Sequence, residues 1–316
     1  MKIRFLLISL LCAQTISAGA AGLVFTGEKD GNSELFRFDP KIMQIEQLSS
    51  ASSNEMQAAI SPDGVTVAFI SDKSGAPSLY LAGINQLKSE WNNISTGMGA
   101  YANPAFSPDG SKIAVRYAPD PELPLTKTQL VIVDPMTKKQ TVLLESSILF
   151  PGSDQEPVYV IDRPEWLDDQ TLLFVIIEYA DLETMRITSS SIKRVTLNDG
   201  KVIQVAGGES YFDEKGQGRG YKASMPKKNG GLISFVAIEG NVDRTPMSMT
   251  LEGKDKKVLP IQDPQFFGPV WNVGKEFWYG IQDDDGKPSI VIKSDGEKTR
   301  KTIPFAGPAF EPAFIP

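Results

Sequence analysis

A short motif that recurs six times limits the fold of this 316-residue chain more than any other feature. The motif is a residue of any kind, then proline or a small residue, then another residue of any kind, then a large apolar or aromatic residue. Its copies are Gln57-Ala58-Ala59-Ile60, Asn103-Pro104-Ala105-Phe106, Arg163-Pro164-Glu165-Trp166, Lys222-Ala223-Ser224-Met225, Gly268-Pro269-Val270-Trp271 and Glu311-Pro312-Ala313-Phe314. A unit of roughly 40 to 60 residues that recurs in this way is typical of propeller blades.

Each of the first five copies is followed by a turn and then by a short apolar strand, as a four-stranded antiparallel blade requires. In the first two copies the turn is Ser-Pro-Asp-Gly, in which we interpret Asp63 and Asp109 as turn residues that bond the following backbone. The apolar strands lie at 65–70, 112–117, 172–177, 232–238 and 277–281. The sequence therefore predicts an all-β, six-bladed β-propeller of four-stranded antiparallel blades, in preference to a two-sheet sandwich.

The two ends of the chain predict how the ring closes. The first expected strands, at 23–26 and 34–38, have no motif copy before them, and the copy at 311–314 has no strands after it. We expect the C-terminal strand to complete the first blade, which would also cover two exposed sheet edges. Residues 21–316 would then be one propeller domain.

The N-terminus has the pattern of a secretory signal peptide. Lys2 and Arg4 precede an apolar run at 5–11, and Ala18-Gly19-Ala20 supplies small residues for cleavage. We expect residues 1–20 to be removed, which leaves no transmembrane anchor. The expected location is the periplasm, with an extracellular location as the alternative.

Composition excludes several kinds of chemistry. The chain contains no histidine, and its one cysteine, Cys12, lies in the expected signal peptide. Mechanisms that need a histidine base, a histidine metal ligand or a cysteine nucleophile are therefore excluded. Loss of Lys2 and Arg4 leaves 30 basic against 39 acidic residues, a net charge of about −9, which argues against nucleic acid as a partner.

The repeats resemble those of the TolB-type (WD-like) propeller family, whose units read approximately Pro-Ala-Trp-Ser-Pro-Asp-Gly before an apolar strand. Residues 104–110 match this pattern almost fully and residues 58–64 match it well. The resemblance implies a six-bladed propeller and a periplasmic location, but the family's fold serves binding proteins, peptidase gate domains and lyases alike. TolB itself has an α/β domain before its propeller, and here the first expected strand follows the signal peptide by about three residues. We therefore expect a propeller without that domain, and no link to the Tol-Pal system is predicted.

The motif also predicts a candidate ligand site. The inner strand of each blade lines the central channel, so the first motif residues should form a ring at one level. That ring would consist of Gln57, Asn103, Arg163, Lys222, Gly268 and Glu311. We expect Arg163 and Lys222 to face an anionic group of a ligand and Glu311 to pair with them or with a cationic group; the alternative is a water-filled channel whose charges satisfy one another.

Other segments suggest weaker alternatives. A glycan-active enzyme would need two channel carboxylates, for which Glu165 and Glu311 are the candidates. A carbohydrate- or small-molecule-binding module would need exposed aromatic residues on one rim, such as Tyr101, Tyr211 or Phe212. Ordinary turn chemistry explains Asp283-Asp284-Asp285-Gly286 without a calcium ion, and the glycine-rich segment 216–220 lacks the residues of a phosphate loop. Loops at 117–127 and 148–158 are either recognition loops or variable hairpin tips.

Together these features predict a non-catalytic, exported propeller that binds a protein or peptide of the cell envelope. We expect no cofactor, no metal ion and a monomeric chain.

Overall fold

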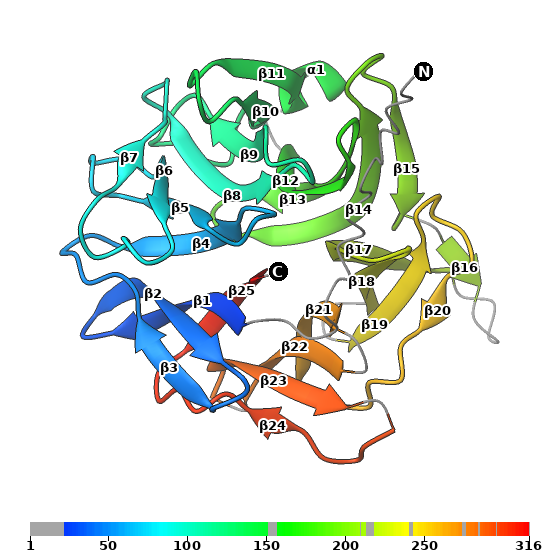
Figure 1. Cartoon of the computed structure of the whole chain (residues 1–316). Coiled ribbons are helices and arrows are strands. Elements are labelled where there is room, and N and C mark those ends of the chain that lie inside the picture. The colour runs from blue at the N-terminus through cyan, green and yellow to red at the C-terminus, as the bar shows by residue number, and fades with distance from the viewer. Residues whose placement is uncertain are drawn as a thin grey trace, which may run out of the picture.

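The computed structural model describes residues 22–150, 157–208, 210–212, 218–239, 243–273, 276–283, 285–294 and 296–315. Six antiparallel sheets surround a central axis, as Figure 1 shows in a view along that axis. The predicted six-bladed propeller is therefore confirmed. The one helix in the described ranges is the short α1 (Ser146–Leu149).

Blades 1 to 3 each have four strands, named here from the channel outward. Blade 1 consists of β25 (Ala309–Ile315), β1 (Gly22–Lys29), β2 (Asn32–Asp39) and β3 (Gln44–Gln47). Blade 2 consists of β4 (Glu55–Ile60), β5 (Thr66–Ser71), β6 (Ser78–Gly83) and β7 (Asn92–Asn93). Blade 3 consists of β8 (Ala100–Phe106), β9 (Ile113–Ala118), β10 (Gln129–Val133) and β11 (Gln140–Glu145).

Blades 4 to 6 follow the same order, with one addition. Blade 4 consists of β12 (Val158–Asp168), β13 (Thr171–Asp181), β14 (Arg186–Thr196) and β15 (Val202–Ala206). Blade 5 consists of β17 (Gly218–Asn229), β18 (Leu232–Glu239), β19 (Asp243–Thr250) and β20 (Lys257–Val258), and a short fifth strand, β16 (Ser210–Phe212), pairs with the beginning of β17. Blade 6 consists of β21 (Phe266–Val273), β22 (Glu276–Gln282), β23 (Pro288–Ser294) and β24 (Lys301–Thr302).

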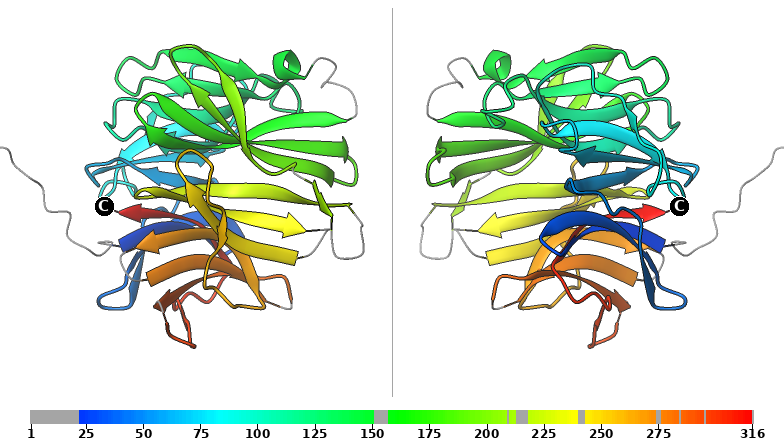
Figure 2. Two further views of the ribbon diagram at one scale, coloured as in Figure 1. Left: turned by 90° about the vertical axis from the view of Figure 1, so that its right-hand side faces the viewer. Right: turned by 90° about the vertical axis from the view of Figure 1, so that its left-hand side faces the viewer.

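The ring closes as predicted, because β25 pairs antiparallel with β1 and becomes the innermost strand of blade 1. Figure 1 shows this strand beside β1 near the centre of the ring, and in the side views of Figure 2 its end emerges at the C-terminus. We call the face where the inner strands begin the start face, and the face where they end the end face.

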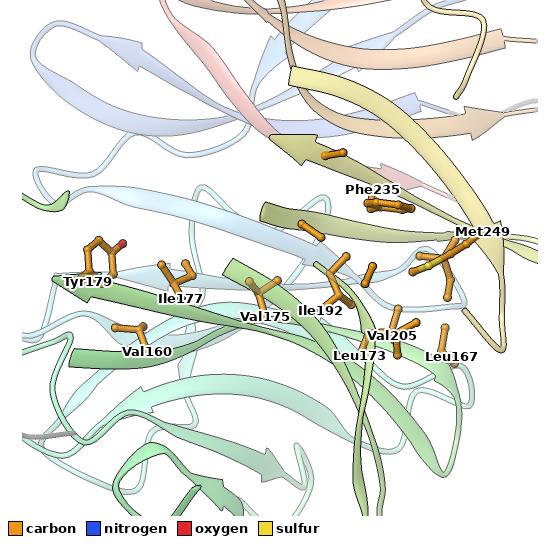
Figure 3. Close-up of a cluster of buried hydrophobic side chains, with 14 of the residues drawn as sticks. Val160, Leu167, Leu173, Val175, Ile177, Tyr179, Ile192, Val205, Phe235 and Met249 are labelled. Carbon is orange, nitrogen blue, oxygen red and sulfur yellow. The ribbon is translucent and has the colours of Figure 1, made fainter. Parts of the chain in front are cut away.

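Burial on both sides of each blade explains the continuous apolar runs in the second strands. Leu23, Val24 and Phe25 are consecutive in β1, so their side chains point to alternating faces, yet all three are fully buried. Each blade packs against two neighbours, and a hydrophobic cluster fills each seam of the ring. Figure 3 shows the cluster between blades 4 and 5, where Val175 and Ile192 lie near Phe235 and Met249.

Candidate functional site

The inner strand of every blade contains a β-bulge whose residues line the central channel. The bulges interrupt the pairing between each inner strand and its neighbour. The first residue of each bulge has a positive φ: Gln57 (55°), Asn103 (53°), Arg163 (50°), Met225 (54°), Gly268 (97°) and Glu311 (54°). We call these six residues the bulge ring. Five of them are not glycine, and the left-handed conformation costs such residues on the order of 1 kcal/mol or more each.

The second residue of each bulge suits a position at which the pairing of the strands is interrupted. It is proline in five blades and alanine in the sixth: Ala58, Pro104, Pro164, Pro226, Pro269 and Pro312. A proline disfavours the right-handed helical conformation in the residue before it and brings no N–H group that the interrupted ladder would leave unpaired. The sequence motif is therefore the signature of the bulge.

The ring prediction is wrong for Lys222, whose place is taken by Met225. In blade 5 the interruption falls between Ser224 and Lys227, so the bulge is Met225-Pro226. Lys222 lies three residues earlier, in regular pairing with Ile238, and its ammonium group donates a hydrogen bond to the carbonyl of Ile187 in blade 4. The other five predicted ring members lie in the ring.

The bulge ring lines a cavity of about 230 Å³ that has two chemically different sides. One side carries Glu311, Gln57, Asn103 and Arg163 from blades 1 to 4. The other side is mainly apolar and is formed chiefly by blades 5 and 6 and the beginning of β25; its residues include Met225, Phe267, Pro269, Ile281, Ile290 and Phe310, with Lys227 as its one charged member among the described residues. Concave sites that combine an apolar wall with a few converging polar groups are typical of ligand pockets.

A chain of hydrogen bonds fixes the polar side. The carboxylate of Glu311 accepts hydrogen bonds from Thr26 Oγ1 (3.2 Å) and from the backbone N–H of Gln57 (3.1 Å). The side-chain carbonyl of Gln57 accepts one from the backbone N–H of Asn103 (2.8 Å), and Asn103 Nδ2 donates to Asp162 Oδ1 (2.6 Å). These ring side chains therefore also hold adjacent blades together.

Arg163 is the single cation among the six bulge-ring residues, and its contact with a carboxylate is long. Its Nε lies 4.0 Å from Asp162 Oδ2, and Arg116 Nη1 lies 3.8 Å from Asp162 Oδ1, so two guanidinium groups share one buried carboxylate. Nearby Tyr179 has a raised pKa because of burial and the charge of Asp162, and the two arginines oppose this shift. Asp162 and Arg116 were not predicted; the position of Asp162 directly before a ring residue is the signal that could have identified it.

Glu311 faces this positive group across the polar side of the cavity. Burial raises the pKa of Glu311, and the charge of Arg163 and the hydrogen bonds from Gln57 and Thr26 work against that rise. The predicted relation between Arg163 and Glu311 is thus a mutual electrostatic influence, with no direct ion pair among the described contacts.

The second proposed carboxylate, Glu165, lies elsewhere. It lines an adjoining cavity toward the end face, together with Trp166, Phe106 and Phe314, and Lys227 and Trp271 line both this cavity and that of the bulge ring. Its carboxylate pairs with Lys227 Nζ (3.0 Å) and accepts a hydrogen bond from the backbone N–H of Lys228 (3.0 Å). Glu165 and Glu311 therefore line adjoining cavities, and the carboxylate of Glu165 is already paired with a lysine.

The turn interpretation of the acidic loops agrees with the structure. Asp63 accepts hydrogen bonds from Ser61 Oγ (2.5 Å) and the N–H of Val65 (3.0 Å), and Asp109 accepts the equivalent bonds from Ser107 Oγ (2.6 Å) and the N–H of Ser111 (2.9 Å). Asp283 accepts one from the N–H of Lys287 (2.7 Å), while Asp284 lies outside the described residues.

The aromatic rim that would favour a carbohydrate-binding module is not supported by Tyr101. Its side chain is 1% exposed, and its hydroxyl donates to Gln140 Oε1 (2.7 Å). The side chains of Tyr211 and Phe212 lie outside the described part of the structure.

Of the longer loops, 119–128 joins β9 to β10, whereas 151–156 and 213–217 lie outside the described residues, as does the expected signal peptide. Within the described ranges, no three histidine, cysteine or acidic side chains gather as metal ligands. Nor does that part of the chain contain a helix with the length and apolar character needed to cross a membrane.

Comparison with known proteins relates these repeats to one family. The family described as the TolB beta propeller domain matches residues 10–157. A TolB homolog of Chlorobaculum tepidum is 27% identical over 125 residues, which are 37% of this chain and 26% of that protein. The matched segment is thus about a quarter of the relative's length.

Solved structures extend the similarity to nearly the whole chain. TolB from Acinetobacter baumannii superposes with a TM-score of 0.66 at 16% identity, covering 94% of this chain and 67% of that one. An oligogalacturonate lyase in complex with manganese superposes with a TM-score of 0.51 at 14% identity, covering 90% of this chain and 74% of that one. At these identities the similarity establishes the fold, and since enzymes share that fold it does not assign a role.

Proposed function

Because the chain is a six-bladed propeller of TolB-type repeats, we propose that it is an exported, periplasmic binding protein that holds a protein or peptide at its channel without catalysis. The observation that carries this proposal is the bulge ring. Strained backbone at equivalent positions in five of the six blades places side chains around one cavity, and such strain persists only where the surrounding structure fixes it, which is common at functional sites.

The two sides of the cavity favour a ligand with an acidic or carboxyl-terminal group beside an apolar side chain. The Arg163 guanidinium lines the cavity and is 4.0 Å from its nearest carboxylate, so it can accept a second anionic partner. The apolar wall at Met225, Phe267 and Phe310 would bury an aliphatic or aromatic side chain of the same ligand. An extended peptide segment provides both groups within a few residues.

The contacts of the two candidate catalytic carboxylates also favour binding over catalysis. The carboxylates of Glu165 and Glu311 are both engaged by protein N–H groups or cations, and they line adjoining cavities. Hydrolysis of a glycoside needs two carboxyl groups on opposite sides of one bond.

The test uses the purified full chain on a peptide array and on a glycan array. The variants are Arg163→Glu, which reverses the ring charge, and Met225→Glu, which places a charge on the apolar wall. Arg194→Glu is the matched control, because Arg194 lies in a different groove between blades 4 and 5. We expect peptides with an acidic residue next to an apolar one to bind the native chain and the control, and to lose at least tenfold in affinity with both ring variants.

Peptide binding that survives both ring variants would move the site away from the channel. Capture of glycans instead of peptides would contradict the proposed ligand class.

A further inference from the structure

Two buried carboxylates lie at the seam between blades 1 and 2, outside the channel cavity. Glu34 belongs to β2 and is 4% exposed, and Glu55 is the first residue of β4 and is 0% exposed. Residues 48–54 connect the two blades over this point on the start face. Neither carboxylate takes part in the channel ring.

Serine hydroxyls donate to one oxygen of each carboxylate, and one further buried oxygen has no partner. Ser49 Oγ donates to Glu34 Oε2 (2.5 Å). Ser53 Oγ and Ser71 Oγ both donate to Glu55 Oε1 (2.6 and 2.9 Å). Glu55 Oε2 is buried and makes no hydrogen bond.

No described lysine or arginine forms an ion pair with either carboxylate. Directly after β5 comes another carboxylate, Asp72, which is held by the backbone N–H (2.9 Å) and the side chain (2.7 Å) of Asn54. The groups that face the pair from β2, the connecting segment and β5 are therefore acidic or uncharged.

The internal repeat shows that packing does not require an acid at this place. Glu55 stands two residues before the bulge-ring residue of its blade. The equivalent residues of the other blades are all buried and apolar or aromatic: Tyr101, Ile161, Ala223, Phe266 and Ala309. An apolar side chain at such a site is usually at least as stabilising as a buried charge.

Two buried negative charges without a cation are costly, and a single added proton removes most of that cost. Burial raises the pKa of Glu55 to about 7, and the charge of Glu34 adds to the rise even though Ser53 and Ser71 oppose it. A proton on Glu55 Oε2 would give the unpartnered atom a hydrogen to donate, with Glu34 as the nearby acceptor.

We propose that Glu34 and Glu55 share one proton at the seam between blades 1 and 2, and that release of this proton loosens the seam. The folded-state pKa lies above the unfolded value of 4.5, so the stabilisation is complete below pH 4.5 and is lost as the pH rises to about 7. Gln57 lies two residues after Glu55 on β4, so the change acts next to the bulge ring. This inference does not depend on the proposed channel ligand.

The first experiment compares the melting temperature of the full chain at pH 5 and pH 8 with that of Glu55→Gln. The glutamine amide donates a hydrogen bond to Glu34 at every pH, so its melting temperature should change less with pH than that of the native chain. Glu46→Gln is the matched control, because Glu46 is in blade 1 but pairs with Arg37 at the surface. The control should keep the native pH dependence. Equal pH dependence in the native chain and Glu55→Gln would overturn the proposal.

Two further measurements keep the proposal testable if Glu55→Gln does not fold. Carbon-13 NMR of the native glutamate carboxyls should show one that titrates with a midpoint near pH 7. Midpoints that all lie below pH 5.5 would overturn the proposal. Calcium chloride at pH 8 should leave the native melting temperature at its value in chelator; a rise there would show that a cation, and not a proton, neutralises the pair.

Discussion

Replacing Phe314 with alanine tests whether the closing strand holds the ring together through aromatic packing. Phe314 lies in β25, and its ring centroid is 5.5 Å from that of Trp271 and 5.2 Å from that of Trp278, both in blade 6. Truncation of a fully buried phenylalanine costs about 3 to 5 kcal/mol. Phe314 is only partly buried, so we scale this to roughly 2 kcal/mol and attribute about 1 kcal/mol more to its two aromatic contacts.

The expected loss for Phe314→Ala is therefore about 2 to 3 kcal/mol in the free energy of unfolding. Urea unfolding followed by tryptophan fluorescence measures it, because Trp271 and Trp278 report on this seam directly. Phe106→Ala is the control, since Phe106 has the same motif position in blade 3, is also partly buried and has no aromatic partner among the described ring contacts. A loss below about 0.5 kcal/mol, or one no larger than that of the control, would refute the role of aromatic packing in closure.

Two further predictions concern local packing and a buried ion pair. Gly280→Ala should cost about 1 to 3 kcal/mol, because the new Cβ would lie 2.2 Å from the carbonyl oxygen of Gly268 in the blade 6 bulge; Gly231→Ala, where the Cβ meets no atom within 4 Å, should be nearly neutral in the same thermal melt. Arg300→Leu should lower the free energy of unfolding by about 3 kcal/mol, because the buried Asp263 carboxylate loses the cation that pairs with it. Although burial alone would raise the pKa of Asp263, hydrogen bonds from Arg300 and Tyr279 hold it below the usual 3.8. The ion pair therefore stabilises the fold above pH 4, and this stabilisation is lost on acidification. In an acid titration of the melting temperature, Arg300→Leu should lack this decrease.

The sequence predicted the blades well because proline and glycine have local, nearly context-free effects on the backbone. Pro104 and Pro312 fall in bulges, and the turns at Asp63 and Asp109 form the expected hydrogen bonds. The closing strand was predictable for a related reason, since a missing strand at one end of a repeat array must be supplied by the other end.

The prediction failed at blade 5 because Lys228 occupies the motif position that is apolar or aromatic in the other blades. The nearest apolar residue, Met225, was therefore given the fourth position when it holds the first. Pro226 was the available signal, because proline is the second motif residue in four of the other blades.

The acid pair at Glu34 and Glu55 was missed for a different reason. The two residues lie 21 positions apart in different blades, and their proximity depends on how blades 1 and 2 pack. A comparison of the repeats at the position two before the ring residue would have shown that Glu55 is exceptional, but it could not have identified Glu34 as its neighbour.

The pairing of β25 with β1 has a consequence for how this molecule reaches its folded state. The hydrogen bond between Thr26 and Glu311 joins residues 285 positions apart, whereas the contacts inside blades 2 to 6 join residues that are close in sequence. Blades with local contacts can form early, but the loop that brings β25 to β1 includes nearly the whole chain, so its closure is expected to be slow. Until it closes, β1 presents an unpaired edge that another chain could occupy, and this blade is where misassembly would begin.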